Sequence, residues 1–476
     1  MQTRFQPAAA LLLLFSLSMS CHTRETTPAG HGNPSDTARA VRLITLDPGH
    51  FHAALVQKSM YPDVDSVVHV YAPPGPDLDL HLDRIKAYNN REKDPTHWSE
   101  QVYSGTDFFE KMLAGHAGNT VVLSGNTREK ADYIFRSLQS GYHVLADKPM
   151  VIDPEGFARL EQAFAIASRN DLLLYDIMTE RFEITSVIQR ELCKRPDVFG
   201  TFQKSNARHP AVIKESVHHF FKQVSGATLT RPPWFFDIRQ QGEGMVDVMT
   251  HLVDLAQWEC FPDQALDYKK DVLVESARHW PTNLSPVQFR ELTRLDSFPD
   301  YLKGNVTSDG SLQVYCNGEI RYALRGVGIR TTATWTYKDS GTMDDTYYSM
   351  LHGTKADLVI RQGAAEGFKP TLYIEPLDRR GAPERNPQTA YEQGLYAAIA
   401  SLQKEFPGLG LERTRSGWRL VVPDKYKEGH EAHFARVMRH FLGYLRERNM
   451  PAWEVPDMLA KYYTTTRALE LARRNK

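Results

Sequence analysis

Residues 120–149 read TVVLSGNTREKADYIFRSLQSGYHVLADKP, and this stretch decides the fold. It opens on the β-branched run Thr120–Ser124, which predicts a strand. A helix is predicted over 127–140, and Gly141 follows it where helices commonly end on glycine. The chain then returns to a short strand at 143–145. A strand, a helix and a second strand in this order predict two parallel strands joined by a crossing helix.

The same alternation extends along the chain in both directions. Strands are predicted at 41–46, 66–71 and 172–175, and helices from the first loop to about Met60 and over 154–169. Strands separated by helices of this length predict a doubly wound parallel sheet with helices on both faces. Such a sheet binds its ligands at the carboxyl ends of its strands.

The pattern changes from about Arg181. Strand candidates spaced as in an antiparallel sheet follow at 312–323, 329–337, 347–352, 356–361 and 371–375. The segments 388–406 and 429–448 are predicted helices, and the second has an apolar face that should dock on a domain. Residues 263–296 are interpreted as a surface excursion that precedes the sheet.

The chain of 476 residues is too long for one compact core, so two domains plus extensions are expected. The predicted fold class is α/β. Residues 41–180 form an N-terminal Rossmann-like doubly wound parallel sheet, and 181–476 form a C-terminal α+β domain with a largely antiparallel open sheet and C-terminal helices. The net charge of -1 gives no electrostatic basis for binding nucleic acid or an anionic membrane surface.

The first forty residues predict export. Arg4 precedes an apolar run that is too short to span a bilayer, and Leu17–Cys21 is similar to a bacterial lipoprotein processing site. We expect 1–21 to be a signal peptide with Cys21 as the lipidation site. Residues 22–40 are rich in Thr, Pro, Gly and Ser and predict a flexible tether. The protein is therefore expected in the periplasm or at the cell surface, held on the membrane by its lipid anchor.

No metal site is predicted. Cys193, Cys260 and Cys316 form no C-x-x-C pair, so neither a disulfide framework nor a zinc or iron–sulfur site is expected. His50 and His52 would point about 200° apart on a helix, so one ion could hold both only if the turn were irregular. A surface role, or one near a phosphate, is favoured for these two residues.

The segment Gly242–Asp254 places ionisable groups among apolar residues. If it is helical, Asp247, His251 and Asp254 share one stripe at i, i+4 and i+7. Buried groups of this kind are costly unless they are paired or used. They either pair with one another in a core helix or line a site, and the segment alone leaves both interpretations open.

Three loops follow strands and are candidates for ligand binding, at 47–52, 124–127 and 146–149. The first is a degenerate G-x-G-x-x-G motif, in which Asp47 and His52 replace the outer glycines and Gly49 is retained. Backbone N–H groups at the following helix could still meet a phosphate. Ala72 stands where an acid usually holds the ribose of a dinucleotide. This loop alone is therefore weak evidence for such a cofactor.

Three residue sets in order point to one family. Ala146–Pro149 follows a strand, Arg181–Phe182 follows the next, and Trp234–Asp237 leads into Gly242–His251. Together they resemble the Gfo/Idh/MocA oxidoreductases over roughly residues 41–258. Exported members of that family with D-P-G-H-F-H in the first loop are the most similar.

The resemblance implies NAD or NADP as cofactor and a sugar, polyol or glycoside as small-molecule substrate. Lys148 would lie between nicotinamide and substrate, and His251, oriented by Asp247, would be the general acid or base because its ordinary pKa lies near neutrality. The implied catalytic residues are Lys148, Asp247 and His251. The implied cofactor-binding residues are Gly49, His50, Phe51, Ser124, Asn126, Asp147 and Lys148. The implied substrate-binding residues are Arg181, Trp234, Asp247 and His251.

Three functions remain open at this point. The first is an NAD(P)-dependent oxidoreductase that holds its cofactor tightly, because free nicotinamide cofactor is scarce outside the cytoplasm. The second is a glycoside-cleaving enzyme of the same fold that works by oxidation, elimination and reduction. The third is a non-catalytic lipoprotein that binds sugars or partner proteins, which Asp47 and Ala72 favour. A homo-oligomer formed through the C-terminal sheet is expected by family analogy alone.

Overall fold

The computed structural model describes residues 41–224, 227–338, 345–377 and 389–474, all of which belong to one compact unit. The predicted signal peptide, the tether and Cys21 lie outside the described residues. Within these ranges, no helix has both the length and the apolar character needed to cross a membrane.

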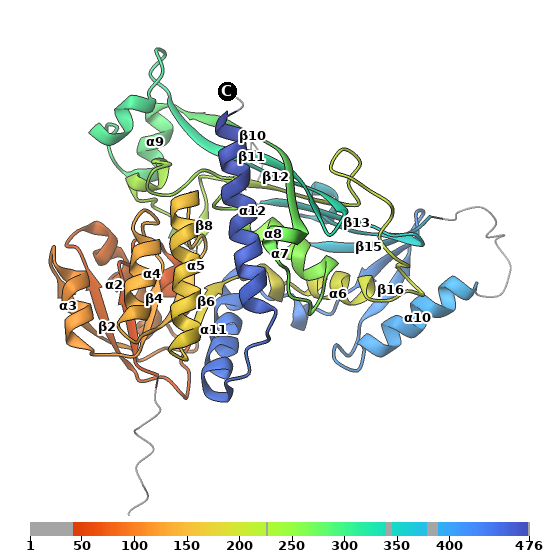
Figure 1. Ribbon diagram of the computed structural model, residues 1–476, viewed down its shortest axis with the longest axis horizontal. Helices are drawn as coiled ribbons and strands as arrows, with labels where there is room; N and C mark the ends of the chain where they lie inside the picture. The colour runs from red at the N-terminus through yellow and green to blue at the C-terminus, as the bar shows by residue number, and fades with distance from the viewer. Residues whose placement is uncertain (1–40, 225–226, 339–344, 378–388, 475–476) are drawn as a thin grey trace, which may run out of the picture. The chain divides into compact units, whose positions relative to one another are not determined.

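Six parallel strands form the first sheet, in the order β3-β2-β1-β4-β5-β6 (Figure 1). The strands are β1 Leu43–Leu46, β2 Val67–Ala72, β3 Ser99–Ser104, β4 Thr120–Leu123, β5 His143–Asp147 and β6 Leu174–Ile177. The helices between them are α1 His52–Val56, α2 Pro76–Asn90, α3 Phe108–Gly115, α4 Lys130–Gln139 and α5 Pro154–Arg169, and α6 Ile184–Cys193 follows β6. This strand order is that of a doubly wound nucleotide-binding sheet, so the predicted fold is confirmed.

Several elements of this half differ from the prediction, and α2 and α3 are among the elements that were not predicted. β3 was not expected, because it pairs only with β2 at the edge of the sheet and most of its side chains face solvent. An edge strand of this kind carries no apolar run by which to recognise it. α1 has only five residues and ends at Val56 rather than near Met60.

Nine strands form the second sheet, in the order β10-β11-β12-β7-β13-β14-β15-β17-β16. The strands are β7 Val212–His219, β10 Val272–Leu284, β11 Leu312–Leu324, β12 Val327–Thr336, β13 Thr346–His352, β14 Ala356–Gln362, β15 Thr371–Pro376, β16 Gly410–Arg413 and β17 Trp418–Val421. Every described pairing is antiparallel except that of β7 with β12, which confirms a largely antiparallel sheet. A two-stranded sheet of β8 Gln223–Val224 and β9 Ala227–Thr228 stands apart.

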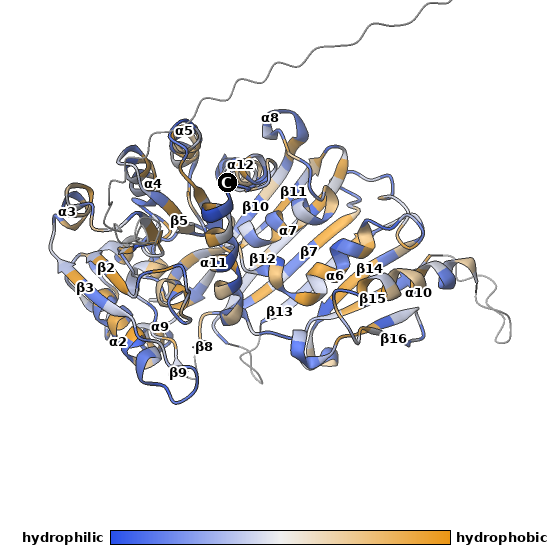
Figure 2. Cartoon of the chain, turned by 90° about the horizontal axis from the view of Figure 1, so that it is seen from below, coloured by the Kyte–Doolittle hydropathy of each residue, from blue (hydrophilic) through white to orange (hydrophobic). Residues whose placement is uncertain are grey.

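Helices cover one face of this second sheet. α6 packs on β14, and α7 (Met249–Cys260) packs on β7 and β12. Figure 2 shows hydrophobic residues along central strands such as β7, beneath these two helices. The remaining helices of this half are α8 Tyr268–Asp271, α9 Pro286–Thr293 and α10 Ala390–Leu402.

The interpretation of 263–296 as a surface excursion is wrong, because β10 runs through it as a long edge strand of the second sheet. Its burial pattern is irregular and its register against β11 shifts twice, so the sequence shows no clean alternation there.

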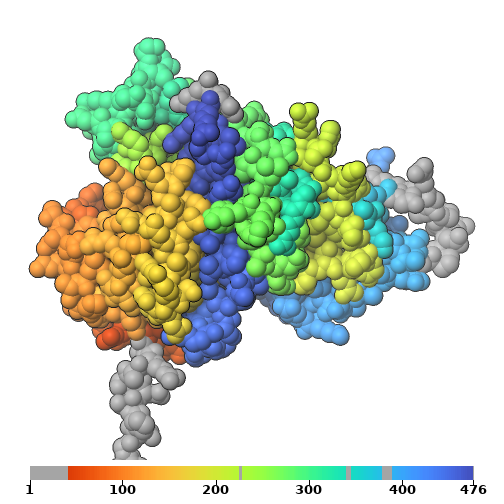
Figure 3. Space-filling model, in the orientation of Figure 1, coloured from red at the N-terminus to blue at the C-terminus, as the bar shows by residue number. Residues whose placement is uncertain are grey.

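Of the last two helices, α11 (His430–Glu447) returns to the first sheet and α12 (Glu454–Arg474) lies between the two halves of the chain. α11 packs against α1 and β6 and adds Phe434, Met438 and Phe441 to the core of that sheet. α12 contacts α5, α7 and β10, and Figure 3 shows it at the surface beside α5. The predicted apolar face of 429–448 therefore docks on the N-terminal half of the chain. The boundary at residue 180 stays a prediction.

His81 on α2 should make the folding stability of the protein depend on pH. Its side chain is buried, neither ring nitrogen has a hydrogen-bond partner among the described residues, and burial lowers its pKa to about 3. The unfolded chain binds this proton with a pKa near 6.5, so stability is lost as pH falls from about 6.5 towards 3.

Between pH 7.5 and pH 5, His81 should cost about 2 kcal/mol of unfolding free energy. Urea titrations of the wild type and of His81→Leu at both pH values should show the wild type losing that much more than the variant. Equal losses in both proteins would show that His81 is not buried as a neutral ring.

Candidate functional site

The carboxyl ends of β1, β4 and β5 bring the three predicted loops together. The loop after β1 turns at Asp47, whose φ of 49° is left-handed, and it passes directly over Gly125 in the loop after β4. A Cβ atom on Gly125 would lie 1.8 Å from the Asp47 carbonyl oxygen, so only glycine permits this approach. The two loops form one surface next to the end of β5.

Lys148 and Asp247 form the central contact of this surface. The Lys148 Nζ atom donates to Asp247 Oδ1 at 2.6 Å, and Gln241 Nε2 donates to Oδ2 of the same carboxylate at 3.0 Å. Burial alone would raise the pKa of Asp247, but the Lys148 ammonium and these hydrogen bonds lower it below its usual value. The pair joins the end of β5 to the turn before α7.

His251 lies on α7, whereas Asp247 lies in the turn before that helix begins at Met249. Burial, together with the Lys148 charge, lowers the pKa of His251 to about 3, and its Nδ1 has no hydrogen-bond partner among the described residues. The ordinary pKa near neutrality, on which its assignment as general acid or base rests, is therefore not the pKa of His251 in this site.

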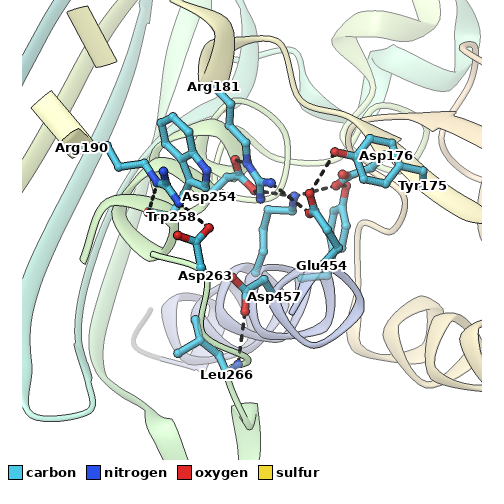
Figure 4. Close-up of polar contacts among 12 residues, drawn as sticks. Tyr175, Asp176, Arg181, Arg190, Asp254, Trp258, Asp263, Leu266, Glu454 and Asp457 are labelled. Carbon is cyan, nitrogen blue, oxygen red and sulfur yellow. Dashed lines mark hydrogen bonds and ion pairs between the residues drawn. The ribbon is translucent and has the colours of Figure 1, made fainter. Parts of the chain in front are cut away.

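The third residue of the predicted stripe, Asp254, has a different role. Arg181 donates to both of its carboxylate oxygens at 2.7 Å, and Lys461 Nζ on α12 donates to Oδ1 at 2.8 Å. Figure 4 shows this network running from β6 to α7 and α12, with Arg181 also donating to Glu454 at 3.0 Å. Because Arg181 is paired with two buried carboxylates, we assign it to the framework that holds α7.

His50 and His52 converge on Asp147, the last residue of β5. Their Nδ1 atoms lie 3.5 Å and 2.9 Å from Asp147 Oδ2, and Ser124 Oγ donates to the same oxygen at 2.9 Å. The structure has the irregular turn on which such a convergence depends. α1 begins only at His52, so His50 stands in the irregular turn before the helix.

Several residues of the site escaped the sequence interpretation. Lys130, at the start of α4, is buried and donates to the backbone oxygens of Asp147 and Pro149 at 3.2 Å and 3.1 Å, and burial lowers its pKa to about 8. Glu180 follows β6, and its Oε1 lies 3.2 Å from His430 Nδ1 on α11. Burial would raise the pKa of Glu180, but the hydrogen bond from His430 holds it well below its usual value. The His430 ring in turn lies 5.8 Å from the His52 ring.

Ala72 leaves the end of β2 without the acidic residue that usually holds the ribose, but a nearby acidic residue, Asp77, lies close to the first loop. Asp77, in the first turn of α2, accepts a hydrogen bond from Trp234 Nε1 at 2.7 Å. A Cβ atom on Gly49 would lie 3.0 Å from both Asp77 Oδ2 and Trp234 Cζ2. Trp234, predicted to bind substrate, thus packs over Gly49, and burial with the nearby Asp77 raises the pKa of Asp47 to about 7.

The other residues that were predicted to bind the cofactor hold the loops of the site together. The Gly49 and His50 N–H groups donate to Asp47 O at 2.8 Å and Ser124 O at 3.1 Å, and the Phe51 ring packs on both histidines. Asn126 Nδ2 donates to Gln240 Oε1 at 2.8 Å. Asn126 therefore ties the loop after β4 to the segment before α7.

The chemistry of the donor set fits a nicotinamide cofactor at the strand ends. Lys148, Asp247 and a neutral His251 gather at the reacting end, and a small hollow next to Gly49 has Arg84 and Arg231 among its lining residues. Arginine side chains beside this loop suit a pyrophosphate. Trp234 must move away from Gly49 before a phosphate can approach the backbone as closely as it does in dinucleotide folds.

Comparisons with known proteins found solved structures similar to this chain. The crystal structure of a putative oxidoreductase from Parabacteroides merdae is 49% identical over 92% of this chain and 98% of that one, with a TM-score of 0.88. The WlbA dehydrogenase from Bordetella pertussis, in complex with NADH and UDP-GlcNAcA, is 14% identical over 92% and 97% of the two chains, with a TM-score of 0.53.

A third similar structure is the 3-ketoreductase KijD10 from Actinomadura kijaniata, in complex with NADP and TDP-benzene. It is 15% identical over 91% of this chain and 98% of that one, with a TM-score of 0.53. At such low identity, WlbA and KijD10 show the fold alone. No curated protein sequence matches the chain.

The family described as "Putative oxidoreductase C terminal domain" matches residues 188–473, which is more than half of the chain. This match covers α7 with His251, the nine-stranded sheet and both C-terminal helices. The chain therefore belongs to this family of oxidoreductases.

Proposed function

We propose that this protein is an NAD(P)-dependent oxidoreductase that transfers hydride between a tightly held cofactor and a sugar, polyol or glycoside. The observation that carries the proposal is the buried Lys148–Asp247 pair at the end of β5, next to a neutral His251. The complexes of WlbA with NADH and of KijD10 with NADP, both of the same fold, support the cofactor assignment.

The cofactor supplies the hydride donor or acceptor, and the protein supplies position and a path for the proton. Lys148 donates a hydrogen bond to the reacting hydroxyl or carbonyl oxygen and stabilises the negative charge that develops on it. Asp247 holds the ammonium of Lys148 in place through its 2.6 Å contact. Asp247 is thus a positioning residue, and Lys148 is the catalytic residue.

His251 accepts the hydroxyl proton when the substrate is oxidised. Its lowered pKa of about 3 keeps the ring unprotonated near neutral pH. A base of such low proton affinity needs a substrate hydroxyl already made acidic by Lys148. The two residues act on the same oxygen from different elements, β5 and α7.

One assay can identify both the substrate and the direction of the reaction. Purified protein is mixed with candidate sugars, polyols and aryl glycosides, and the near-ultraviolet absorbance of the nicotinamide is followed alongside product analysis by mass spectrometry. We expect a stoichiometric absorbance change and an oxidised or reduced product for at least one sugar class. A protein that holds cofactor but changes neither its absorbance nor any compound would contradict the proposal.

A second candidate function is glycoside cleavage by transient oxidation, elimination and reduction. It is favoured by the Glu180–His430 pair near His251, since elimination needs a further acid or base that simple hydride transfer does not. Release of the aryl leaving group without net change in nicotinamide absorbance would identify this reaction.

We also propose that the protein is exported and anchored to the membrane through a lipid on Cys21, as residues 1–40 predict. Labelling of expressing cells with a fatty-acid analogue should mark the wild type and leave Cys21→Ser unlabelled. Equal labelling of both would place the lipid elsewhere.

Self-association through the nine-stranded sheet is proposed as well, and a monomeric mass by light scattering would contradict it.

A further inference from the structure

Three potential ligand atoms of different residues meet at the end of β5. One potential ligand atom each of His50, His52 and Asp147 lies within 4.8 Å of the other two, and the Nδ1 atoms of His50 and His52 lie 3.5 Å and 2.9 Å from Asp147 Oδ2. Two ligand atoms on one tetrahedral zinc ion are about 3.4 Å apart, because zinc binds each at about 2.1 Å. The spacing in this cluster is therefore that of metal ligands.

The two carboxylate oxygens of Asp147 differ in their hydrogen bonding. Oδ2 receives Ser124 Oγ and faces both rings, whereas Oδ1 is buried and has no hydrogen-bond partner among the described residues. A buried carboxylate oxygen without a partner is costly. Hydrogen bonds among these residues alone leave that oxygen unsatisfied, and a bound cation would satisfy it.

Contacts outside the cluster hold Asp147 and His52 in place. Lys130 Nζ donates to the Asp147 backbone oxygen, and the His52 ring packs on Phe434 of α11 at 4.6 Å between centroids.

We propose that His50, His52 and Asp147 bind one divalent transition-metal ion of the zinc class, with a fourth position left for a water or a substrate oxygen. Two imidazoles and one carboxylate are the ligand set of open zinc and non-haem iron sites. The Lys148 ammonium does not oppose the ion strongly, because Asp247 neutralises it at 2.6 Å.

The position of the cluster gives the ion a role. Asp147 directly precedes Lys148, so the fourth ligand position lies at the reacting end of the proposed active site. There the ion would act as a Lewis acid on an oxygen of the substrate. Metal binding itself does not rest on the proposed function, since it is measured without cofactor or substrate.

The test uses the full chain, purified without a polyhistidine tag and stripped of metal with a chelator. Zn²⁺ is titrated by calorimetry, and Co²⁺ is added separately because its visible absorption reports tetrahedral coordination. We expect one ion per chain. We expect His50→Gln, His52→Gln and Asp147→Asn each to weaken binding by about 100-fold or more, and Ser124→Ala by about 10-fold as a supporting residue.

His81→Gln is the matched control, because it removes a buried imidazole that touches none of these ligands. It should bind the ion as the wild type does. Circular dichroism melts verify that each variant is folded, and if His52→Gln does not fold, the half-buried His50 gives the decisive variant. A folded wild type that takes up no ion, or ligand variants that bind as tightly as His81→Gln, would overturn the proposal.

Discussion

Replacement of Lys148 by Met should lower kcat by roughly 10²–10⁴-fold while the cofactor stays bound. The ammonium is the donor closest to the proposed reacting oxygen, and Asp247 holds it at 2.6 Å. Met has a similar length but cannot donate a hydrogen bond or carry charge. Turnover with the best substrate and cofactor content by mass spectrometry are measured on the same preparation.

Lys148→Met also leaves Asp247 as a buried charge without its ion-pair partner, which destabilises the protein. The double variant Lys148→Met, Asp247→Asn removes that charge and should recover stability but not activity. Lys111→Met, an exposed lysine on α3, is the matched control and should keep full turnover. A folded Lys148→Met protein with kcat within 10-fold of the wild type would show that this lysine takes no part in the chemistry.

Replacement of Lys461 by Met should cost about 3–5 kcal/mol of unfolding free energy. Lys461 is fully buried on α12, and its Nζ lies 2.6 Å from Asp176 Oδ2 and 2.8 Å from Asp254 Oδ1. Without the ammonium, Asp254 keeps Arg181, but Asp176 keeps only the hydrogen bond from Tyr462. Chemical denaturation of the wild type and the variant measures the difference.

The exposed pair Lys427–Asp424, at 2.8 Å, provides the control, and Lys427→Met should change stability by less than about 0.5 kcal/mol. Adding Asp176→Asn to Lys461→Met removes the unpaired carboxylate and should restore part of the loss. A loss of under about 1 kcal/mol for Lys461→Met would mean that the network of Figure 4 does not hold α7 in place.

The parallel sheet was predictable from the sequence because its central strands are buried on both faces and read as short apolar runs. Thr120–Leu123 is such a strand, buried at every position. β3 and β10 were missed for the opposite reason: they are edge strands, and their side chains are half exposed without regular alternation. α12 was missed because it is buried on several sides and mixes lysine, threonine and tyrosine with its apolar residues.

Within the site, motif and order brought Lys148 and Asp247 to one place, and the structure joins them at 2.6 Å, whereas several of the partners distant in sequence were not predicted. Arg181 was predicted to bind substrate, yet Asp254 and Glu454 hold it from α7 and α12. The convergence of His50 and His52 depends on where α1 begins, and helix boundaries are poorly set by local sequence. The low pKa of His251 follows from burial, which a sequence pattern does not measure.

The central claim is that this chain holds a nicotinamide cofactor at the ends of β1, β4 and β5. The most direct measurement is to denature purified full-length protein and identify released small molecules by mass spectrometry and absorbance. We predict close to one NAD(H) or NADP(H) per chain, or saturable uptake of one of them with a change in Trp234 fluorescence that Trp234→Phe removes. A folded protein that releases neither cofactor and takes up neither on titration would contradict the account.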